Sequence, residues 1–282
     1  MEDKNLLLQI ESKKNNFTKT ETKIAEFVLE DFEKVVYMSI TELSDTLKVS
    51  EGTIVRFCQK MGFSGFHPFK ISLAVTQRTI TDTDDLFTVN NGDVRALKNY
   101  VARRNIEIIE STNQFISETE LALCVEDIKN ANKILISGMG ASGNTAGDFF
   151  YKLIRLGLNC QRTIDAHMQA MLASQLHKED VLIAISQSGS TLEIVDIAQQ
   201  AKAQEAKVIS ITGYERSPLT KYSDRVLLTP TKETPFESGA IRAKIAQLFV
   251  IELLFSALYI EMKDSGLKNI KRTADSVAKW IY

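Results

Sequence analysis

Short apolar runs alternate with helical patterns through the second half of the chain, and this alternation constrains the fold more than any other feature of the sequence. The apolar runs cover residues 133–137, 159–164, 181–185, 208–211 and 226–228, and helices are predicted over 144–156, 192–203 and 239–262. A strand, a helix and a second strand in succession form a parallel sheet covered by helices on both faces. The region is therefore predicted to be a three-layer α/β domain.

The first part of the chain, in contrast, carries helical patterns only. Thr18 and Glu21 form a capping box before a helix predicted over 19–32, and Ser39 and Glu42 form a second box before a short helix. After a turn at 48–50, a further helix begins with Ser50 as its N-cap. Its apolar residues recur at i, i+3, i+4 and i+7 and are expected to face the core: Ile54, Phe57, Cys58 and Met61. This pair of helices is interpreted as a helix-turn-helix.

Four segments follow from these patterns. We predict a helix-turn-helix domain at 1–78, a linker rich in Thr, Asp and Asn at 79–93, an α/β domain at 94–263 and a C-terminal helix at 264–282. Helical patterns resume at Val94, directly after the linker.

The second helix of a helix-turn-helix presents its outer residues to base edges in the major groove. The candidate DNA-binding residues are Lys48, Ser50, Glu51, Gly52, Thr53, Val55, Arg56, Gln59 and Lys60. Arg56 can pair bidentately with guanine, whereas Lys48 and Lys60 suit backbone phosphates. Residues 48–78 hold five basic residues and one acid, although the whole chain has a formal net charge of −2. This local charge favours DNA binding over the alternative of a helical protein-interaction module.

Two loops rich in glycine and hydroxyl groups follow the first and third predicted strands. The first loop, residues 138–143, reads Gly-Met-Gly-Ala-Ser-Gly, and the second loop, residues 186–191, reads Ser-Gln-Ser-Gly-Ser-Thr. Because a helix N-terminus offers free N–H groups and the positive end of its dipole, hydroxyl donors placed there can hold a phosphate without a lysine. Adjacent strand ends of an open α/β sheet form a ligand-binding crevice. A phosphate site is predicted, with plain Ser/Gly-rich turns as the alternative.

The first loop also satisfies the dinucleotide fingerprint G-x-G-x-x-G, and Asp165 lies 22 residues after Gly143. A nicotinamide- or flavin-dependent oxidoreductase is therefore an alternative. The hydroxyls of Ser137 and Ser142 and the presence of the second loop favour a compact polar ligand instead. No cofactor is expected.

The two halves together resemble bacterial regulators of the RpiR/MurR type. The stretch from 49 to 66, VSEGTIVRFCQKMGFSGF, is close to their helix-turn-helix pattern. Residues 118–262 resemble a SIS (sugar isomerase) domain through the first and second loops. The resemblance implies a flavodoxin-like domain that binds a phosphorylated sugar or amino sugar. It also implies a homodimer or larger assembly that binds operator DNA and represses, or sometimes activates, a sugar-catabolism operon.

By that similarity Ser186, Ser188 and Thr191 would hold the phosphate, and Ser137 and Ser142 would bind sugar or phosphate oxygens. The full set of candidate ligand-binding residues is Ser137, Gly140, Ser142, His167, Ser186, Gln187, Ser188, Ser190, Thr191 and Glu237.

Enzymes that resemble this domain interconvert aldose and ketose phosphates and need a positioned acid or base, usually Glu or His. His167 and Glu237 are the candidates, and either can equally bind the sugar and set its specificity. The attached helix-turn-helix favours a regulator without catalytic residues. A phosphosugar isomerase with an accessory helical domain is the runner-up.

Cysteine usage and the lack of long apolar runs indicate the cellular compartment of the protein. Cys58, Cys124 and Cys160 are scattered among apolar neighbours, which indicates reduced thiols, and no His/Cys cluster has metal-ligand spacing. The N-terminus lacks the layout of a signal peptide, and no apolar run approaches the ~20 residues that span a bilayer. A cytoplasmic protein without a membrane partner or a metal is expected.

Overall fold

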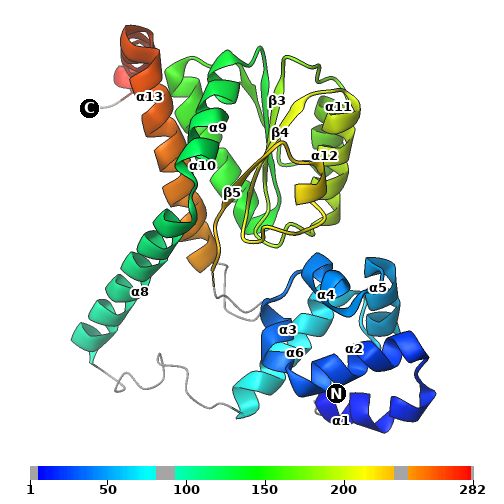
Figure 1. The fold of residues 1–282 in the computed structure, drawn as a ribbon. Coiled ribbons are helices and arrows are strands. Elements are labelled where there is room, and N and C mark those ends of the chain that lie inside the picture. Colours follow the sequence, from blue (N-terminus) through cyan, green and yellow to red (C-terminus); the bar gives the residue numbers. More distant parts are fainter. Residues whose placement is uncertain (1–5, 81–92, 232–240, 281–282) are drawn as a thin grey trace. The chain divides into compact units, whose positions relative to one another are not determined.

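The computed structural model of the chain describes residues 6–80, 93–231 and 241–280 (Figure 1). The chain divides into two compact units, and the division falls within one helix, between Glu107 and Ile108. We call them the helical unit and the sheet unit. The predicted fold class is confirmed, with helices in the first part and a parallel sheet with helices in the second. The domain limits proposed from the sequence stay predictions.

The helical unit begins with seven short elements. They are α1 (Leu6–Ser12), the 3-10 helix η1 (Lys14–Asn16), α2 (Lys19–Glu30), α3 (Phe32–Tyr37), α4 (Ile40–Leu47), α5 (Glu51–Lys60) and α6 (Phe66–Ile80). Both predicted capping boxes form, with Glu21 closing onto Thr18 and Glu42 closing onto Ser39. The single helix predicted over 19–32 is wrong at its end. Asp31 leaves the helical conformation and its carboxylate accepts a hydrogen bond from the Lys34 N–H, which starts α3.

The sheet unit is built on five parallel strands. Its elements are α8 (Val94–Phe115), α9 (Glu118–Asn130), β1 (Ile134–Gly138), α10 (Gly140–Leu156), β2 (Cys160–Gln161), α11 (Ala166–Ala173), β3 (Val181–Ile185), α12 (Leu192–Ala203), β4 (Lys207–Thr212), the 3-10 helix η2 (Thr220–Tyr222), β5 (Arg225–Leu228) and α13 (Ile241–Ala278). The strand order is β2-β1-β3-β4-β5, which is the order of flavodoxin-like folds. α8 lies partly in each unit.

Helices cover both faces of this sheet. Alternate strand residues, such as Ile136 and Ile183, pack on one face against α9, α10 and α13. Their neighbours Leu135 and Leu182 pack on the other face against α11 and α12. Figure 1 shows these two helical layers on either side of the strands. The near-continuous apolar character of β1, β3 and β4 is therefore explained, because these central strands are buried on both faces.

Three of the differences between the predicted and observed elements lie near the first loop. β2 has two residues instead of the predicted 159–164, and α10 begins at Gly140 and not at 144. α11 was not predicted, because its residues are apolar on all sides and have no helical period. Each difference lies at or beside the first loop, because Arg162 after β2 donates to the Gly143 carbonyl and Gln169 on α11 contacts Ser137.

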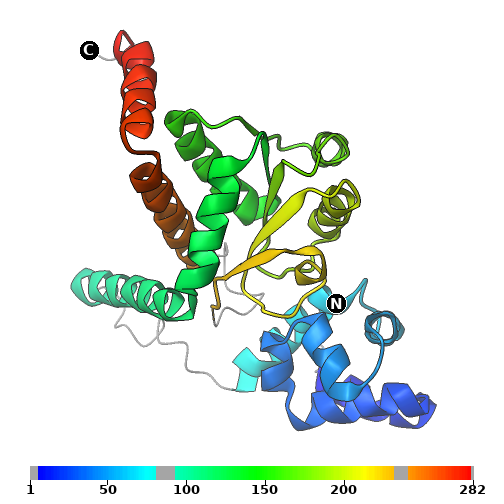
Figure 2. The same ribbon diagram turned by 45° about the horizontal axis from the view of Figure 1, so that its top comes forward.

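Helix α13 contains one interruption. Lys263 has φ +47° and ψ −128°, which is not helical, and it separates a long stretch from a shorter C-terminal one (Figure 2). This residue lies where the sequence analysis separates a long helix from a C-terminal helix. Within the described residues α13 is also the one helix whose length and composition would allow it to cross a membrane. Its face formed by Val250, Leu254 and Leu258 packs in the core of the sheet unit, as in a core helix.

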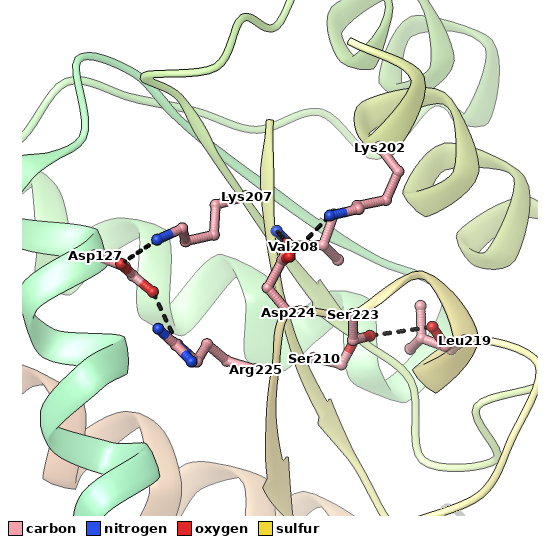
Figure 3. A network of polar contacts seen from close by, with 9 residues as sticks. All are labelled: Asp127, Lys202, Lys207, Val208, Ser210, Leu219, Ser223, Asp224 and Arg225. Carbon is pink, nitrogen blue, oxygen red and sulfur yellow. Dashed lines mark hydrogen bonds and ion pairs between the residues drawn. The ribbon is translucent and has the colours of Figure 1, made fainter. Parts of the chain in front are cut away.

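A network of polar side chains connects the amino-terminal ends of β4 and β5 to the neighbouring helices (Figure 3). The Asp127 carboxylate on α9 accepts hydrogen bonds from Lys207 Nζ at 2.8 Å and from Arg225 Nε at 3.1 Å. Asp224 in turn accepts from Lys202 Nζ at 2.7 Å and from the Val208 N–H at 2.8 Å. These contacts lie at the strand ends opposite the two loops, so we interpret them as structural.

We expect Asp127→Ala to lower the free energy of unfolding of the sheet unit by about 1–3 kcal/mol, because two cations lose a shared and largely buried partner. Urea denaturation of the full chain measures the change. Asp196→Ala, which removes an exposed carboxylate from α12, is the control and should cost less than about 0.5 kcal/mol. Equal losses in the two variants would show that the network adds nothing to stability.

Candidate functional site

The turn between α4 and α5 is closed by backbone geometry and by hydroxyl groups. Lys48 adopts a left-handed conformation with φ +53°, and the Ser44 hydroxyl donates a hydrogen bond to the Val49 carbonyl. Ser50 then caps α5 by accepting a hydrogen bond from the Thr53 N–H at 3.2 Å. The predicted helix-turn-helix is therefore present in the local structure, with α5 as its second helix.

The inner and outer faces of α5 are those that the sequence predicts. Ile54, Phe57 and Cys58 are fully buried, and Met61 follows them into the core. Among the candidate DNA-binding residues, Lys48, Ser50, Gly52, Arg56, Gln59 and Lys60 are exposed, and Glu51, Thr53 and Val55 are half-buried. The outer face of α5 is thus open to a partner.

A chain of hydrogen bonds holds Arg56 at the start of this face. Arg56 Nη2 donates to Thr53 Oγ1 at 3.1 Å, and Thr53 Oγ1 lies 2.8 Å from Ser50 Oγ. Glu51 is engaged elsewhere, because its Oε1 accepts a hydrogen bond from the Thr41 hydroxyl on α4. The guanidinium group is therefore oriented by its own helix, and for the predicted DNA contact this would lower the conformational entropy lost on binding.

Two of the basic residues counted in the local charge have structural roles. Lys60 Nζ lies 2.8 Å from Glu21 Oε2 and 2.8 Å from the Asn16 carbonyl, and it sits over the Phe17 ring. The hydrogen bond with Lys60 holds the pKa of the Glu21 carboxyl below its usual range. A phosphate contact by Lys60 stays a prediction, and it would compete with this ion pair.

Lys70 is a second basic residue of 48–78 that does not contribute to the surface charge expected from the sequence. Its side chain is buried, its Nζ donates to the Met38 carbonyl at 2.8 Å, and it lies over the Phe66 ring. Burial lowers the pKa of Lys70 to about 8. The basic surface of residues 48–78 is therefore smaller than the sequence suggests, since the Lys70 ammonium group is buried and bonded to the Met38 carbonyl.

In the sheet unit the first and second loops emerge side by side. β1 and β3 are neighbours, and Gly138 at the end of β1 pairs with Ile185 at the end of β3. β2 lies on one side of this pair and β4 on the other, so the chain order reverses here. This is the topological switch point at which open α/β sheets bind ligands. The structure therefore brings the two predicted loops together.

The helices that follow these loops begin without a side-chain cap. Met139 precedes α10 and Thr191 precedes α12, and neither side chain makes a capping hydrogen bond within the described residues. The positive φ of Gly140, +56°, allows α10 to begin directly after β1. The first N–H groups of both helices are thus available to an anion.

The second loop is a compact arrangement of hydroxyl groups. Ser186 is buried, and its hydroxyl donates to Thr191 Oγ1 at 3.3 Å. Ser188 Oγ accepts from the Ser190 N–H at 3.2 Å, and the Ser190 hydroxyl donates to the Ser188 carbonyl at 3.1 Å. Four hydroxyl groups therefore gather within six residues around the start of α12, as the sequence predicts.

Gly189 fixes the shape of that loop. Its φ is +58°, and a Cβ built at this position would lie 2.2 Å from Ser217 Oγ and 3.1 Å from Thr212 Oγ1. Its carbonyl also accepts a hydrogen bond from the Leu219 N–H at 2.9 Å. Only glycine satisfies both the backbone conformation and the space.

The hydroxyls of the first loop are held by two buried amides that the sequence analysis did not identify. Ser137 is fully buried and donates to Gln169 Oε1 on α11. Ser142 Oγ accepts a hydrogen bond from Gln247 Nε2 on α13 at 3.1 Å. The available signal was weak. Gln247 is a polar residue inside a long apolar helix, and Gln169 lies in the helix that has no sequence period.

Gln187 connects the second loop to the residues that follow β5 and to α13. Its Nε2 donates to the Thr229 carbonyl at 3.0 Å and to Thr231 Oγ1 at 3.1 Å, and its Oε1 accepts from the Thr229 hydroxyl at 3.1 Å. The same Oε1 lies 3.4 Å from Gln247 Nε2. Gln247 therefore joins the two loops through Ser142 and Gln187, and the Gln187 side chain is more a support of the site than a free ligand group.

Among the described residues, the candidate acid/base residue His167 makes no hydrogen bond with the hydroxyls of the two loops. His167 is exposed in the first turn of α11, whereas Gln169, two positions later, is the residue that reaches Ser137. Glu237 lies outside the described residues. The proposed roles of these two residues in sugar recognition stay predictions.

The structure gives the dinucleotide fingerprint a steric explanation. A Cβ at Gly138 would lie 2.8 Å from the Ser142 carbonyl oxygen, and a Cβ at Gly143 would lie 2.9 Å from the Gly138 carbonyl oxygen. Close packing of the strand end against the first turn of α10 therefore requires these glycines. Asp165 caps α11 by accepting a hydrogen bond from the Met168 N–H at 2.8 Å.

Comparison with known proteins identifies the families that the two parts of the chain resemble. Residues 4–78 match the helix-turn-helix domain of the rpiR family, and residues 127–257 match the SIS domain. An uncharacterized HTH-type transcriptional regulator of Clostridium perfringens is 34% identical over 95% of this chain and 98% of its own. One from Caldanaerobacter subterraneus is 36% identical over 96% of each chain. The Vibrio vulnificus NanR protein, solved in complex with ManNAc-6P, is 30% identical with a TM-score of 0.85, over 98% of this chain and 99% of that one.

A helix-turn-helix followed by a SIS domain defines a transcriptional regulator. The full-length relatives carry that name, which is the name of a regulator and not of an isomerase or an oxidoreductase, so the enzyme alternatives are not favoured. The chain belongs to the rpiR family of HTH-type transcriptional regulators.

Proposed function

We propose that the protein represses a sugar-catabolism operon and that a phosphosugar, bound where the first and second loops meet, controls its affinity for the operator. The observation that carries the proposal is the pairing of β1 with β3, which places two hydroxyl-rich loops and two uncapped helix N-termini at one point of the sheet. The proposal places the protein in the cytoplasm, where phosphorylated sugars and DNA are both present.

The chemistry of the crevice suits a phosphate that is held by neutral donors. Neither the first nor the second loop contains a lysine or an arginine. The phosphate would instead be bound by the hydroxyls of Ser186, Ser188 and Thr191 and by the first N–H groups of α12. Ser142 lies on the neighbouring loop, where its hydroxyl can bind a sugar or phosphate oxygen.

An amino-sugar phosphate is the first ligand to test. NanR, which matches this chain over nearly its whole length, was solved with ManNAc-6P. We propose that the ligand of this chain is of the same class, a phosphorylated sugar or amino sugar. The phosphate would be bound in the second loop, and the sugar would be recognised by residues outside that loop, with His167 and Glu237 as candidates.

Control of DNA binding requires an oligomer and two states. In a homodimer, two copies of α5 would contact successive major grooves of a pseudo-palindromic operator, with half-sites about 34 Å or a multiple of that apart. The phosphosugar would have to bind the DNA-free and DNA-bound states with different affinities, because otherwise it would shift nothing. Ser142 and Gln187 both contact Gln247. A ligand that moved either loop would therefore act on α13.

Fluorescence anisotropy of the full chain on DNA from upstream of its own gene tests the proposal. Binding should be tight and should weaken steeply with salt. One phosphorylated sugar from a panel of hexose, amino-sugar and pentose phosphates, with ManNAc-6P included, should change the operator affinity by at least about tenfold. The same sugar without its phosphate is the control and should have no effect. Operator binding that no phosphosugar alters would contradict the proposed control.

A further inference from the structure

Helix α8 carries an apolar stripe that is only partly covered. Val94, Val101, Ile108 and Phe115 recur every seven residues, and Leu97 lies beside the first two. This is the spacing with which one helix packs along another. Ile108 is buried, whereas Val94 is 74% exposed and Val101 is 47% exposed. The stripe therefore continues beyond the part that its own chain covers.

A groove with a matching surface runs along the sheet unit between α9 and α13. It has a volume of about 600 Å³. Its apolar lining comes from Leu121, Ala122, Val125, Ala257 and Ile260. Ile260 is 69% exposed, so the groove presents apolar surface to solvent along its edge.

The charges of the two surfaces are complementary. The first half of α8, Val94–Arg104, contains four basic residues and no acid. The groove is lined by three glutamates and one lysine, and that lysine, Lys129, is paired with Glu261 at 3.0 Å. Glu118 and Glu126 are therefore the groove carboxylates that could attract a basic helix.

We propose that the groove between α9 and α13 receives the first half of α8 from a second copy of this chain. The stripe of Val94, Leu97 and Val101 fills the apolar floor, and Lys98 beside the stripe pairs with Glu126. The lengths agree, since residues 94–104 span about 16 Å as a helix and the 13 residues of α9 about 20 Å. A two-fold axis repeats the contact and fills both grooves.

The proposal rests on the homo-oligomer of the proposed function and adds the surfaces that form it. It does not depend on the identity of the ligand. The two proposals can be refuted separately. Measurements of operator and phosphosugar binding test the proposed function, whereas the mass of the assembly in sedimentation tests this interface.

Charge reversal across the interface, followed by sedimentation of the full chain, tests the contact. Lys98→Glu on α8 and Glu126→Lys on α9 should each raise the dimer dissociation constant about 5- to 30-fold, because each places like charges together. The two substitutions combined should restore it to within about threefold of the original chain. Leu97→Asp with Val101→Asp should raise it at least about 100-fold, since it places carboxylates in an apolar groove.

A control on the same helix separates this contact from a general effect of charge. Arg103 is exposed and lies nine residues, or about two and a half turns, after Val94, on the opposite side of α8. Arg103→Glu makes the same change of charge and should leave the dissociation constant unchanged. A chain that is monomeric at all concentrations, a combined variant that is not restored, or an Arg103→Glu variant as weak as Lys98→Glu would each overturn the proposal.

Discussion

Gly189→Ala should weaken phosphosugar binding about 30- to 1,000-fold while leaving operator binding in the absence of ligand unchanged. The added methyl group would lie 2.2 Å from Ser217 Oγ, and the residue would also have to keep a φ of +58°. The backbone conformation alone costs about 1–2 kcal/mol for a residue with a Cβ. Because the clash is with a neighbouring loop, the second loop must shift, and the donors around Ser188 shift with it.

Isothermal titration with the phosphosugar found in the operator assay measures this loss. Gly62→Ala is the matched control, because Gly62 also has a positive φ, +94°, but a Cβ there has no atom within 4 Å. It introduces backbone strain without a clash, at the end of α5, and should keep the ligand affinity. A Gly189→Ala variant that binds the phosphosugar within about threefold of the original chain would remove the second loop from the site.

The second large effect is expected at the outer face of α5, which we propose contacts DNA. Arg56→Ala should lower operator affinity about 10- to 100-fold and should lower affinity for unrelated DNA much less, because a bidentate contact to one guanine carries about 1–3 kcal/mol of discrimination. The hydrogen bond of Arg56 to Thr53 orients the guanidinium group for such a contact.

Anisotropy on operator DNA and on a scrambled duplex of the same length separates sequence-specific affinity from nonspecific affinity. Arg56→Lys is the control for charge, because lysine keeps the positive charge but lacks the planar pair of donors. It should retain binding to the scrambled duplex and lose the preference for the operator. If Arg56→Ala weakened binding to both duplexes equally, Arg56 would be a phosphate contact and its assigned role would be wrong.

The parts of the fold that are determined by local interactions could be predicted from the sequence. The capping boxes at Thr18 and Ser39 involve residues three positions apart, so the starts of α2 and α4 are visible in the sequence. The faces of α5 follow from the helical period. The meeting of the first and second loops could be predicted as well. These loops follow β1 and β3, and the ends of parallel strands lie at one edge of the sheet.

What the sequence did not reveal depends on contacts between distant residues. Nothing near Lys60 indicates that its ammonium group binds Glu21 on another helix, and nothing near Lys70 indicates its burial. Gln247 reaches Ser142 from 105 positions away in the chain. Polar partners of this kind are determined by tertiary packing, and they decide which hydroxyls of the crevice are already engaged.

The contact between the Gly138 carbonyl and the first turn of α10 has a consequence for the recognition of such proteins. Glycines at this spacing are demanded by the crossing of a strand end and a helix, whatever molecule is bound above them. Surveys that search for the glycine spacing alone will therefore collect regulators with a SIS domain among the dehydrogenases. Ser142, which stands between two of those glycines, and the second loop after β3 are the features that would separate the two groups.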